Sequence, residues 1–153
     1  MNNLEVEFVE FDRVFLGVSW KWLMDDEIRT LTNASFITKS QQEEWFASLP
    51  SQADYYIWGI KYLDIPIGVC GIKHKTLKNG EYWGYIGDKN YWGKGIGKVM
   101  LQFIEHKAKM MNLNALYLHV SSDNIRALKL YSHYGFLIES KDRNLIRMNK
   151  NLW

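Results

Sequence analysis

Glycine alternates with other residues in the stretch Tyr91-Trp92-Gly93-Lys94-Gly95-Ile96-Gly97-Lys98. Glycines at such positions allow a backbone to approach a ligand closely. The stretch leads into an amphipathic helical pattern, and the free N–H groups at the start of a helix bind phosphate. Lys94 and Lys98 add positive charge beside them. These residues predict a loop that binds a phosphate or pyrophosphate group.

Two familiar nucleotide sites do not fit this loop. A P-loop needs Ser or Thr directly after its Gly-Lys, whereas Val99 follows Gly97-Lys98 here. A Rossmann fingerprint needs G-x-G-x-x-G after a first strand, whereas this chain has Gly93-x-Gly95-x-Gly97 late in its sequence. The loop is therefore interpreted as a pyrophosphate loop for coenzyme A, with a glycine-rich turn without a ligand as the alternative.

A second motif follows after one predicted helix and one predicted strand. Residues 124–136 read Asn-Ile-Arg-Ala-Leu-Lys-Leu-Tyr-Ser-His-Tyr-Gly-Phe, which matches N-x-x-A-x-x-x-Y-x-x-x-G-F. Together with the glycine loop, this motif resembles the cofactor-binding core of GNAT acetyltransferases over about Glu81–Phe136. That family usually carries Arg or Gln where this chain has Trp92. This difference has little effect on phosphate binding if the loop binds through its backbone N–H groups.

The resemblance implies that acetyl-CoA sits in a V between the strand ending near Gly87 and the strand Ala115–Val120. The backbone of Tyr85, Ile86 and Gly87 would pair with the pantetheine arm, and Asn124 would contact it. Tyr131 would lie near the sulfur and protonate the leaving thiolate; its alternative role is packing in the core. The other implied cofactor-binding residues are Trp92, Gly93, Lys94, Gly95, Ile96, Gly97, Lys98 and Arg126.

Acetyl transfer to an amine also needs a base that takes the proton of the amine. His119 is the first candidate, since relatives that acetylate protein N-termini or amino sugars often carry Glu at this point, and neutral imidazole accepts a proton near pH 7. A buried, hydrogen-bonded histidine is the alternative. Glu81 and His74 are rivals, directly or through a water. His106 and His133 are expected to face solvent. No metal is expected, because no His and carboxylate pair shows ligand spacing.

The N-terminal half indicates the acceptor. Segments 20–29 and 41–46 resemble the GNAT branch that includes ribosomal-protein N-terminal acetyltransferases and enzymes that acetylate the 4-amino group of nucleotide-linked deoxy-amino-sugars. Glu27-Ile28-Arg29 and Trp45-Phe46 favour the amino-sugar enzymes. Aromatic side chains here could stack on a base or a sugar ring, or could pack in the core. The expected acceptor-binding residues are Trp22, Asn33, Phe36, His74 and Trp83.

Three functions therefore stay open. The preferred one is an N-acetyltransferase for a nucleotide-linked amino sugar. The second is a protein N-terminal, small-amine or aminoglycoside N-acetyltransferase, and the third is a non-catalytic acyl-CoA-binding module. A peptide acceptor would favour an open acidic groove, whereas a nucleotide sugar would favour an aromatic and basic pocket.

Hydrophobic periodicity places these residues on an α/β fold in the order β-α-α-β-β-β-α-β-α-β-β. One β-α-β unit reads as a parallel crossover, so the sheet is expected to be mixed. Ser19 is expected to cap a first helix, Thr38 with Gln41 forms a capping box before a second, and Asn79-Gly80 marks a turn. Strands are expected over 4–11, 55–62, 67–73, 81–87, 115–120, 137–141 and 145–152, and helices over 20–31, 39–49, 95–111 and 124–134.

Length and composition set the remaining expectations. The 153 residues fit one GNAT domain over residues 1–153. A net charge of +2 offers no concentrated basic face for nucleic acid. No apolar stretch approaches the roughly 18 residues of a membrane span, so a cytoplasmic location is expected. Cys70 is the single cysteine, so an internal disulfide is excluded, and this residue is expected to be buried. The final strand, ending at Trp153, is a candidate edge for a homodimer.

Overall fold

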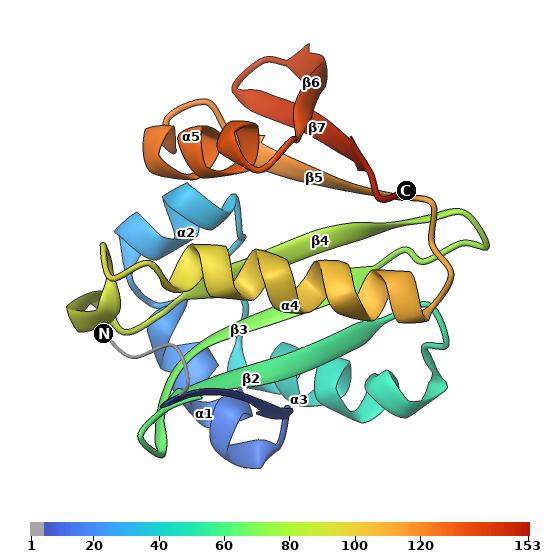
Figure 1. The fold of residues 1–153 in the computed structure, drawn as a ribbon. Coiled ribbons are helices and arrows are strands. Elements are labelled where there is room, and N and C mark those ends of the chain that lie inside the picture. Colours follow the sequence, from blue (N-terminus) through green and yellow to red (C-terminus); the bar gives the residue numbers. More distant parts are fainter. Residues whose placement is uncertain (1–4) are drawn as a thin grey trace.

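The computed structural model describes residues 5–153, which form one mixed seven-stranded sheet with helices packed on it (Figure 1). The strand order is β1-β2-β3-β4-β5-β7-β6, and only β4 and β5 are parallel neighbours within these residues. None of the helices in this part of the chain is long and apolar enough to cross a membrane. The strands are β1 Val6–Glu10, β2 Tyr56–Tyr62, β3 Ile65–Lys73, β4 Asn79–Ile86, β5 Ala115–Ser121, β6 Leu137–Asp142 and β7 Leu145–Asn151. The helices are α1 Arg13–Trp22, α2 Asp26–Thr32, α3 Lys39–Ser48, α4 Ile96–Met110 and α5 Ile125–His133.

Most predicted elements are confirmed. The capping box at the start of α3 has the predicted pair of hydrogen bonds, in which the Thr38 hydroxyl accepts from the N–H of Gln41 and the Gln41 side chain accepts from the N–H of Thr38. Each end of α4 lies within one residue of its predicted position, and Asn124 caps α5. The mixed α/β fold is therefore confirmed. Leu4, the predicted start of the first strand, lies outside the described residues.

The predicted helix over Trp20–Leu31 is wrong, because two helices share this region. Asp12 caps α1 by accepting a hydrogen bond from the N–H of Phe15 at 3.2 Å, and Asp25 caps α2. Ser19 is buried inside α1. Asp and Ser are both good N-caps, and the complete burial of Phe15 against the sheet stabilises the earlier start. Three helices therefore precede β2 instead of two.

The turn predicted at Asn79-Gly80 is also wrong, since these residues begin β4. The preceding turn is made by Thr76, whose hydroxyl accepts hydrogen bonds from the N–H groups of Lys78 and Asn79. A Cβ at Gly80 would lie 2.6 Å from Ile72 Cγ2. Close packing between strands, and not turn geometry, therefore explains this glycine.

The final strand is not a free edge. β7 lies between β5 and β6, and pairs with both. The outermost strands of the sheet are β1 and β6. Pairing of β7 with a second copy is therefore blocked in this arrangement, and the homodimer stays a prediction.

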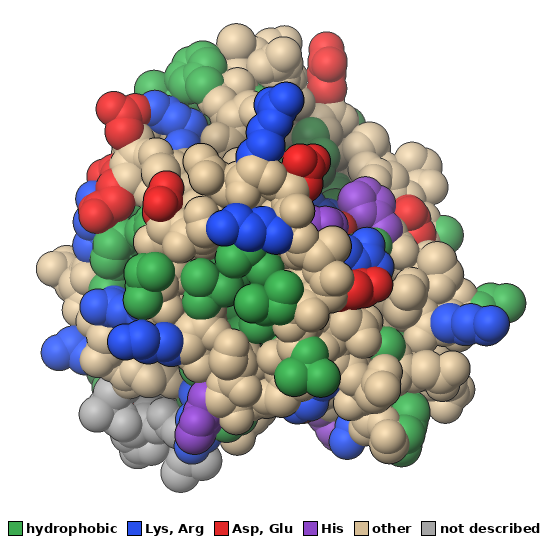
Figure 2. All heavy atoms as spheres, turned by 90° about the horizontal axis from the view of Figure 1, so that it is seen from above, with side chains coloured by type: hydrophobic (Ala, Val, Ile, Leu, Met, Phe, Trp, Pro, Cys, Tyr) green, Lys and Arg blue, Asp and Glu red, His purple; other side chains and the backbone are tan. Residues whose placement is uncertain are grey.

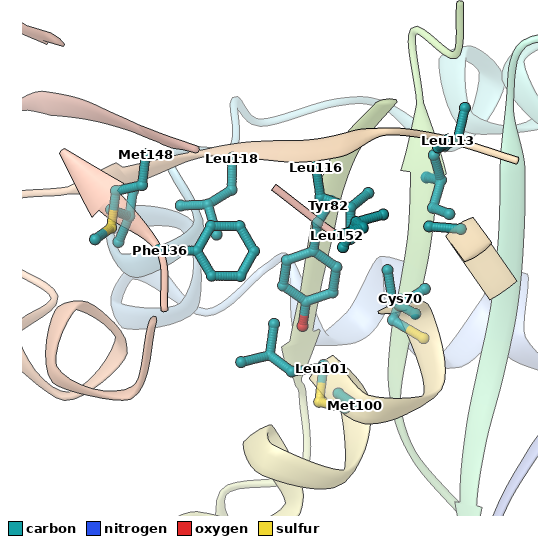
Figure 3. Packing of buried hydrophobic residues seen from close by; sticks show 14 of the residues in the cluster. Cys70, Tyr82, Met100, Leu101, Leu113, Leu116, Leu118, Phe136, Met148 and Leu152 are labelled. Atoms are coloured by element: carbon teal, nitrogen blue, oxygen red, sulfur yellow. The ribbon is translucent and has the colours of Figure 1, made fainter. Parts of the chain in front are cut away.

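Alternate residues of β3 show that the sheet has two cores. Val69 packs on one face with Phe15 of α1 and Phe11. Cys70 packs on the opposite face with Met100 of α4 and is completely buried, as predicted. Figure 3 shows the second core, in which side chains of β5 and of β4 lie toward α4; the labelled residues include Tyr82, Leu101, Leu116, Leu118 and Phe136.

β4 and β5 separate soon after they begin (Figure 1). Their pairing joins Asn79–Glu81 to Ala115–Tyr117, whereas β4 continues to Ile86 and β5 continues to Ser121. The sheet is therefore split next to the later parts of both strands. This split is the V that the family resemblance implied.

Candidate active site

A cavity of about 870 Å³ occupies the split in the sheet. Its walls come from β4, the loop before α4, β5 and α5, and on the other face of the sheet from α1, α2 and α3. The predicted site residues that line it are Asn33, Trp83, Tyr85, Ile86, Trp92, Gly93, Gly95, Ile96, Gly97, Lys98, His119, Asn124, Arg126 and Tyr131. The predicted residues outside its lining are Trp22, Phe36, His74, Glu81, Gly87 and Lys94.

The glycine loop has the geometry of an anion site. Gly93 and Gly95 have φ angles of 72° and 83°, a left-handed conformation that favours glycine. No side chain of residues 5–153 caps α4, and the N–H groups from Gly93 to Lys98 have no backbone acceptor in this part of the chain. Lys98 and Arg126 add positive charge to the cavity wall. The donors present therefore fit a phosphate or pyrophosphate group.

Trp92 has a structural role beside this loop. Its indole N–H donates to the carbonyl of Ile86 at 2.8 Å, which ties the loop to the end of β4. The Lys89 ammonium lies 5.6 Å from the centre of the Trp92 ring. The side chain that replaces the usual Arg or Gln of the family thus fixes the position of the loop.

Glu81 joins two histidines at the bottom of the split. Its Oε2 lies 3.0 Å from His119 Nδ1, and its Oε1 lies 3.0 Å from His74 Nδ1. Lys73 Nζ is 4.0 Å from Oε2. Burial raises the pKa of Glu81, but the hydrogen bond from His119, the charge of Lys73 and the hydrogen bond from His74 lower it overall below its usual value. The carboxylate is therefore ionised at neutral pH. Figure 2 shows one face of the molecule on which histidine side chains lie beside acidic and basic ones.

The carboxylate determines which ring nitrogen of His119 is free. An ionised carboxylate only accepts hydrogen bonds, so Nδ1 of His119 is the donor to Glu81. In the neutral ring, Nε2 then has no proton and can accept one. His119 thus has a ring nitrogen that can accept a proton, its ring is held by the buried Glu81 carboxylate, and it lines the cavity.

Tyr131 reaches the split from the other face of the sheet. It packs edge-on against Tyr82, with ring centres 6.1 Å apart, and against Phe136. Tyr82 and Glu81 are consecutive in β4, so their side chains point to opposite faces. Burial raises the pKa of Tyr131 to about 12, so the phenol keeps its proton at neutral pH. A proton acceptor and a proton donor therefore stand on opposite sides of one opening.

Asn124 links two walls of the cavity. Its Oδ1 accepts from the N–H of Ala127 at 3.3 Å, and its Nδ2 donates to the carbonyl of Leu31 at 3.3 Å. The start of α5 is thereby joined to the end of α2. The predicted contact between Asn124 and the pantetheine stays a prediction.

The structure does not bring Trp22 and Phe36 to the cavity. The Trp22 ring covers Gly87, where a Cβ would lie 2.0 Å from Trp22 Cδ2, and it meets Tyr85 edge-on. Phe36 is 56% exposed, and the Arg29 guanidinium lies 5.9 Å from its ring centre. The contact with Gly87 anchors α1 to the end of β4, which is a packing role.

Several lining residues were not among the predicted site residues. Lys73 stands opposite Glu81 in the register of β3 and β4, and strand alternation from Val69 could have indicated that it faces the same side. Ser19 and Gln42 come together across 23 positions of sequence, which no local pattern reveals. The aromatic lining residues that were also missed are Phe11, Trp45 and Tyr55.

Known proteins share parts of this sequence. A probable spermine N(1)-acetyltransferase of Bacillus subtilis subsp. natto is 42% identical over 62 residues, which cover 39% of this chain and 41% of that relative. The chain thus matches less than half of the length of this relative. Acetyltransferase PseH of Campylobacter jejuni is 23% identical over 138 residues, 90% of this chain and 86% of PseH.

Solved structures share the fold. A spermidine N-acetyltransferase of Vibrio cholerae in complex with CoA and spermine superposes with a TM-score of 0.88 at 17% identity, over 97% of this chain and 96% of that one. The C. jejuni PseH structure with acetyl coenzyme A has a TM-score of 0.75 at 19% identity, over 95% of this chain and 98% of that one. The model of the acetyltransferase (GNAT) family matches residues 20–136. Because this match includes the glycine loop, both strands of the split and α5, we conclude that the chain belongs to the GNAT family of acetyltransferases.

Proposed function

We propose that the protein is an acetyl-CoA-dependent N-acetyltransferase that modifies a primary amine on a small molecule. The observation that carries the proposal is the position of the cavity. It passes through the split sheet, with the anion-binding loop and Tyr131 toward one face and His119 toward the other. A donor and an acceptor that entered from opposite faces would meet at the split.

The side chains at the split match the proton transfers of this reaction. Bound acetyl-CoA would supply an acetyl group activated as a thioester. His119 Nε2 accepts the proton of the attacking amine, while Glu81 holds the ring and stabilises its positive charge. A C–N bond forms and the C–S bond breaks. Tyr131 donates its phenolic proton to the leaving sulfur. The loop at Gly93–Lys98 binds the pyrophosphate.

The lining of the cavity favours a nucleotide-linked amino sugar as acceptor. Asp123 is the one carboxylate among the described lining residues, and Lys73 is the cation that remains for the acceptor, since Lys98 and Arg126 are assigned to the cofactor. An anionic pyrophosphate linkage of the acceptor could pair with Lys73. Aromatic rings form much of the acceptor side and could stack on a base or a sugar; they are Phe11, Trp45, Tyr55, Trp83 and Tyr85.

The identity to a spermine acetyltransferase favours a second candidate, a polyamine. A polyamine carries several positive charges and needs carboxylates near its path. The described lining holds one carboxylate, Asp123, and carries Lys73 on the acceptor side, so it offers such a ligand few partners. A protein N-terminus would need an open acidic groove, which a lining with one carboxylate does not provide. A polyamine and a protein N-terminus are therefore less suitable acceptors than the amino sugar.

Thiol release from acetyl-CoA tests the proposal. The panel holds UDP- and dTDP-linked 4-amino sugars, spermidine, an N-terminal peptide and an aminoglycoside. Turnover with a nucleotide sugar is the expected result. Turnover confined to spermidine or to the peptide would overturn the acceptor class but not the reaction. Thermal stabilisation by acetyl-CoA without any turnover would instead support a non-catalytic acyl-CoA-binding module.

A further inference from the structure

A buried polar pair interrupts the aromatic wall on the acceptor side of the cavity. Ser19 of α1 is 4% exposed and Gln42 of α3 is 5% exposed, and both line the cavity. Trp45 follows Gln42 by one helical turn and lines the cavity as well. Amide side chains are rarely this buried unless their hydrogen bonds are made.

The hydrogen bonds of the pair fix the orientation of the amide. The Ser19 hydroxyl donates to the carbonyl of Leu16 at 3.1 Å. Since its one proton is used there, Ser19 Oγ can only accept from Gln42, which donates through Nε2 at 3.3 Å. The carbonyl Oε1 of Gln42 is therefore turned away from Ser19. Within residues 5–153 this oxygen has no hydrogen-bond partner.

We propose that Gln42 Oε1 recognises the acceptor by accepting a hydrogen bond from one of its hydroxyl or N–H groups. Oε1 keeps some accessible surface, because the one fully buried polar side-chain atom without a partner among the described residues is Trp83 Nε1. A ligand that fills the cavity would displace water from Oε1 and must offer a donor in its place. The surrounding rings suit the apolar face of a sugar, whose hydroxyl groups supply donors at its rim. The ligand class is thus a hydroxylated amine. This inference rests on the proposed function.

The same geometry selects against other amines. An acceptor that presents only methylene groups at this point would leave Oε1 unpaired and desolvated. Sites built to hydrogen-bond a substrate hydroxyl reject analogues that lack it more strongly than purely apolar pockets reject extra methylenes. Gln42 is accordingly a specificity-determining residue, and Ser19 is the positioning residue that orients its amide.

Gln42→Leu tests the inference, because leucine keeps most of the volume and removes both hydrogen-bonding groups. With a UDP-linked 4-amino sugar as probe, we expect the KM of the sugar to rise about 10- to 100-fold. The kcat and the KM of acetyl-CoA should change little. Ser19→Ala should give a smaller rise, since it only frees the amide to rotate. Gln102→Leu, the same change at an exposed position of α4, is the matched control and should behave as wild type.

The outcomes separate the inference from the proposed function. If the wild-type protein acetylates the sugar and Gln42→Leu shows the same sugar KM, the inference is wrong and the proposed function stands. If the wild-type protein neither binds nor acetylates the sugar, the proposed acceptor class is wrong, and the inference fails with it. A thermal shift with acetyl-CoA shows that each variant is folded. If Gln42→Leu fails this check, the sugar KM of Ser19→Ala decides.

Discussion

Glu81 is a buried carboxylate whose surroundings determine its charge. Desolvation alone would favour its protonated form. His119, His74 and Lys73 reverse this preference, because each donates a hydrogen bond or places a positive charge near the carboxylate. An ionised Glu81 is also what keeps His119 in the tautomer that can accept a proton. The stability of the fold and the proposed base therefore depend on the same proton equilibrium.

The lowered pKa of Glu81 predicts how stability depends on pH. The contribution of a carboxyl with a lowered folded-state pKa is complete above its unfolded pKa, about 4.3 for Glu, and is lost as the pH falls through the folded value. Glu81→Gln should therefore cost roughly 1–3 kcal/mol of unfolding free energy at pH 7. The difference from wild type should shrink as the pH falls below about 4. Urea unfolding across this range measures it.

The control for this comparison is Glu44→Gln, since Glu44 is exposed on α3. Its unfolding free energy should follow that of the wild-type protein at each pH. A gap between wild type and Glu81→Gln that stays constant from pH 7 to pH 3 would contradict the assigned ionisation.

Tyr131→Phe tests the proposed acid. The ring keeps its contacts with Tyr82 and Phe136, whereas the proton for the leaving sulfur is lost. We expect kcat to fall roughly 10²- to 10⁴-fold, with little change in the affinity for acetyl-CoA. Tyr134→Phe removes a hydroxyl from the same helix end, outside the cavity lining, and should keep full activity. Loss of acetyl-CoA binding in Tyr131→Phe would instead assign Tyr131 to structure.

At the scale of elements, the start of α4 combines a left-handed backbone with uncapped N–H groups. Gly95→Asp would place a carboxylate at the proposed pyrophosphate site, and we expect the affinity for acetyl-CoA to fall about 100-fold or more. Gly95→Ala shows how much of this loss of affinity comes from backbone strain and how much comes from the negative charge. No atom lies within 4 Å of a Cβ at this position, so alanine should cost only about 1–2 kcal/mol of stability, from its positive φ.

Calorimetric titration of both variants with acetyl-CoA measures the difference. Gly95→Ala should bind much more tightly than Gly95→Asp. Equal affinities would show that the backbone conformation, and not the charge, decides binding at this loop.

How far the sequence predicts the elements depends on how local their causes are. The capping box at Thr38 and the helical period of α4 involve neighbours in sequence, and both are confirmed. The start of α1 was missed because Asp12, Ser19 and Asp25 are all suitable caps, and only packing against the sheet selects between them. The contact of Trp22 with Gly87 is equally non-local. Propensity cannot rank such alternatives.

The candidate site divides in the same way. The loop around Gly95 and the motif around Tyr131 are contiguous in sequence. All predicted site residues in them except Lys94 line the cavity. The bridge from Glu81 to His119 spans 38 positions and depends on the parallel register of β4 and β5. The sequence predicted His119, Glu81 and His74 as candidates for the base. It did not predict that the Glu81 carboxylate is hydrogen-bonded to both histidines. The register of paired strands supplied that information.

At the scale of the whole molecule, the split sheet joins two compartments into one cavity. The glycine loop and Tyr131 lie toward the face of α4, and His119 with the aromatic wall lies toward the face of α1 and α3. Donor and acceptor can thus be bound together. Cys70, the single cysteine of the chain, is completely buried, and burial raises the pKa of its thiol. It is a poor candidate for an acetyl carrier.

This architecture predicts direct transfer within a ternary complex. Initial rates measured against both substrates should give intersecting double-reciprocal lines, because both must be present before acetyl transfer and release of the thiol. Cys70→Ala should preserve kcat, although it leaves a small void beside Met100 and lowers stability by about 1 kcal/mol. Parallel lines, together with loss of activity in Cys70→Ala, would indicate an acetylated cysteine intermediate. The cavity would then have to open toward the core at Cys70, on the face of β3 that packs against α4, and the assignment of His119 as the base for direct attack would fail with it.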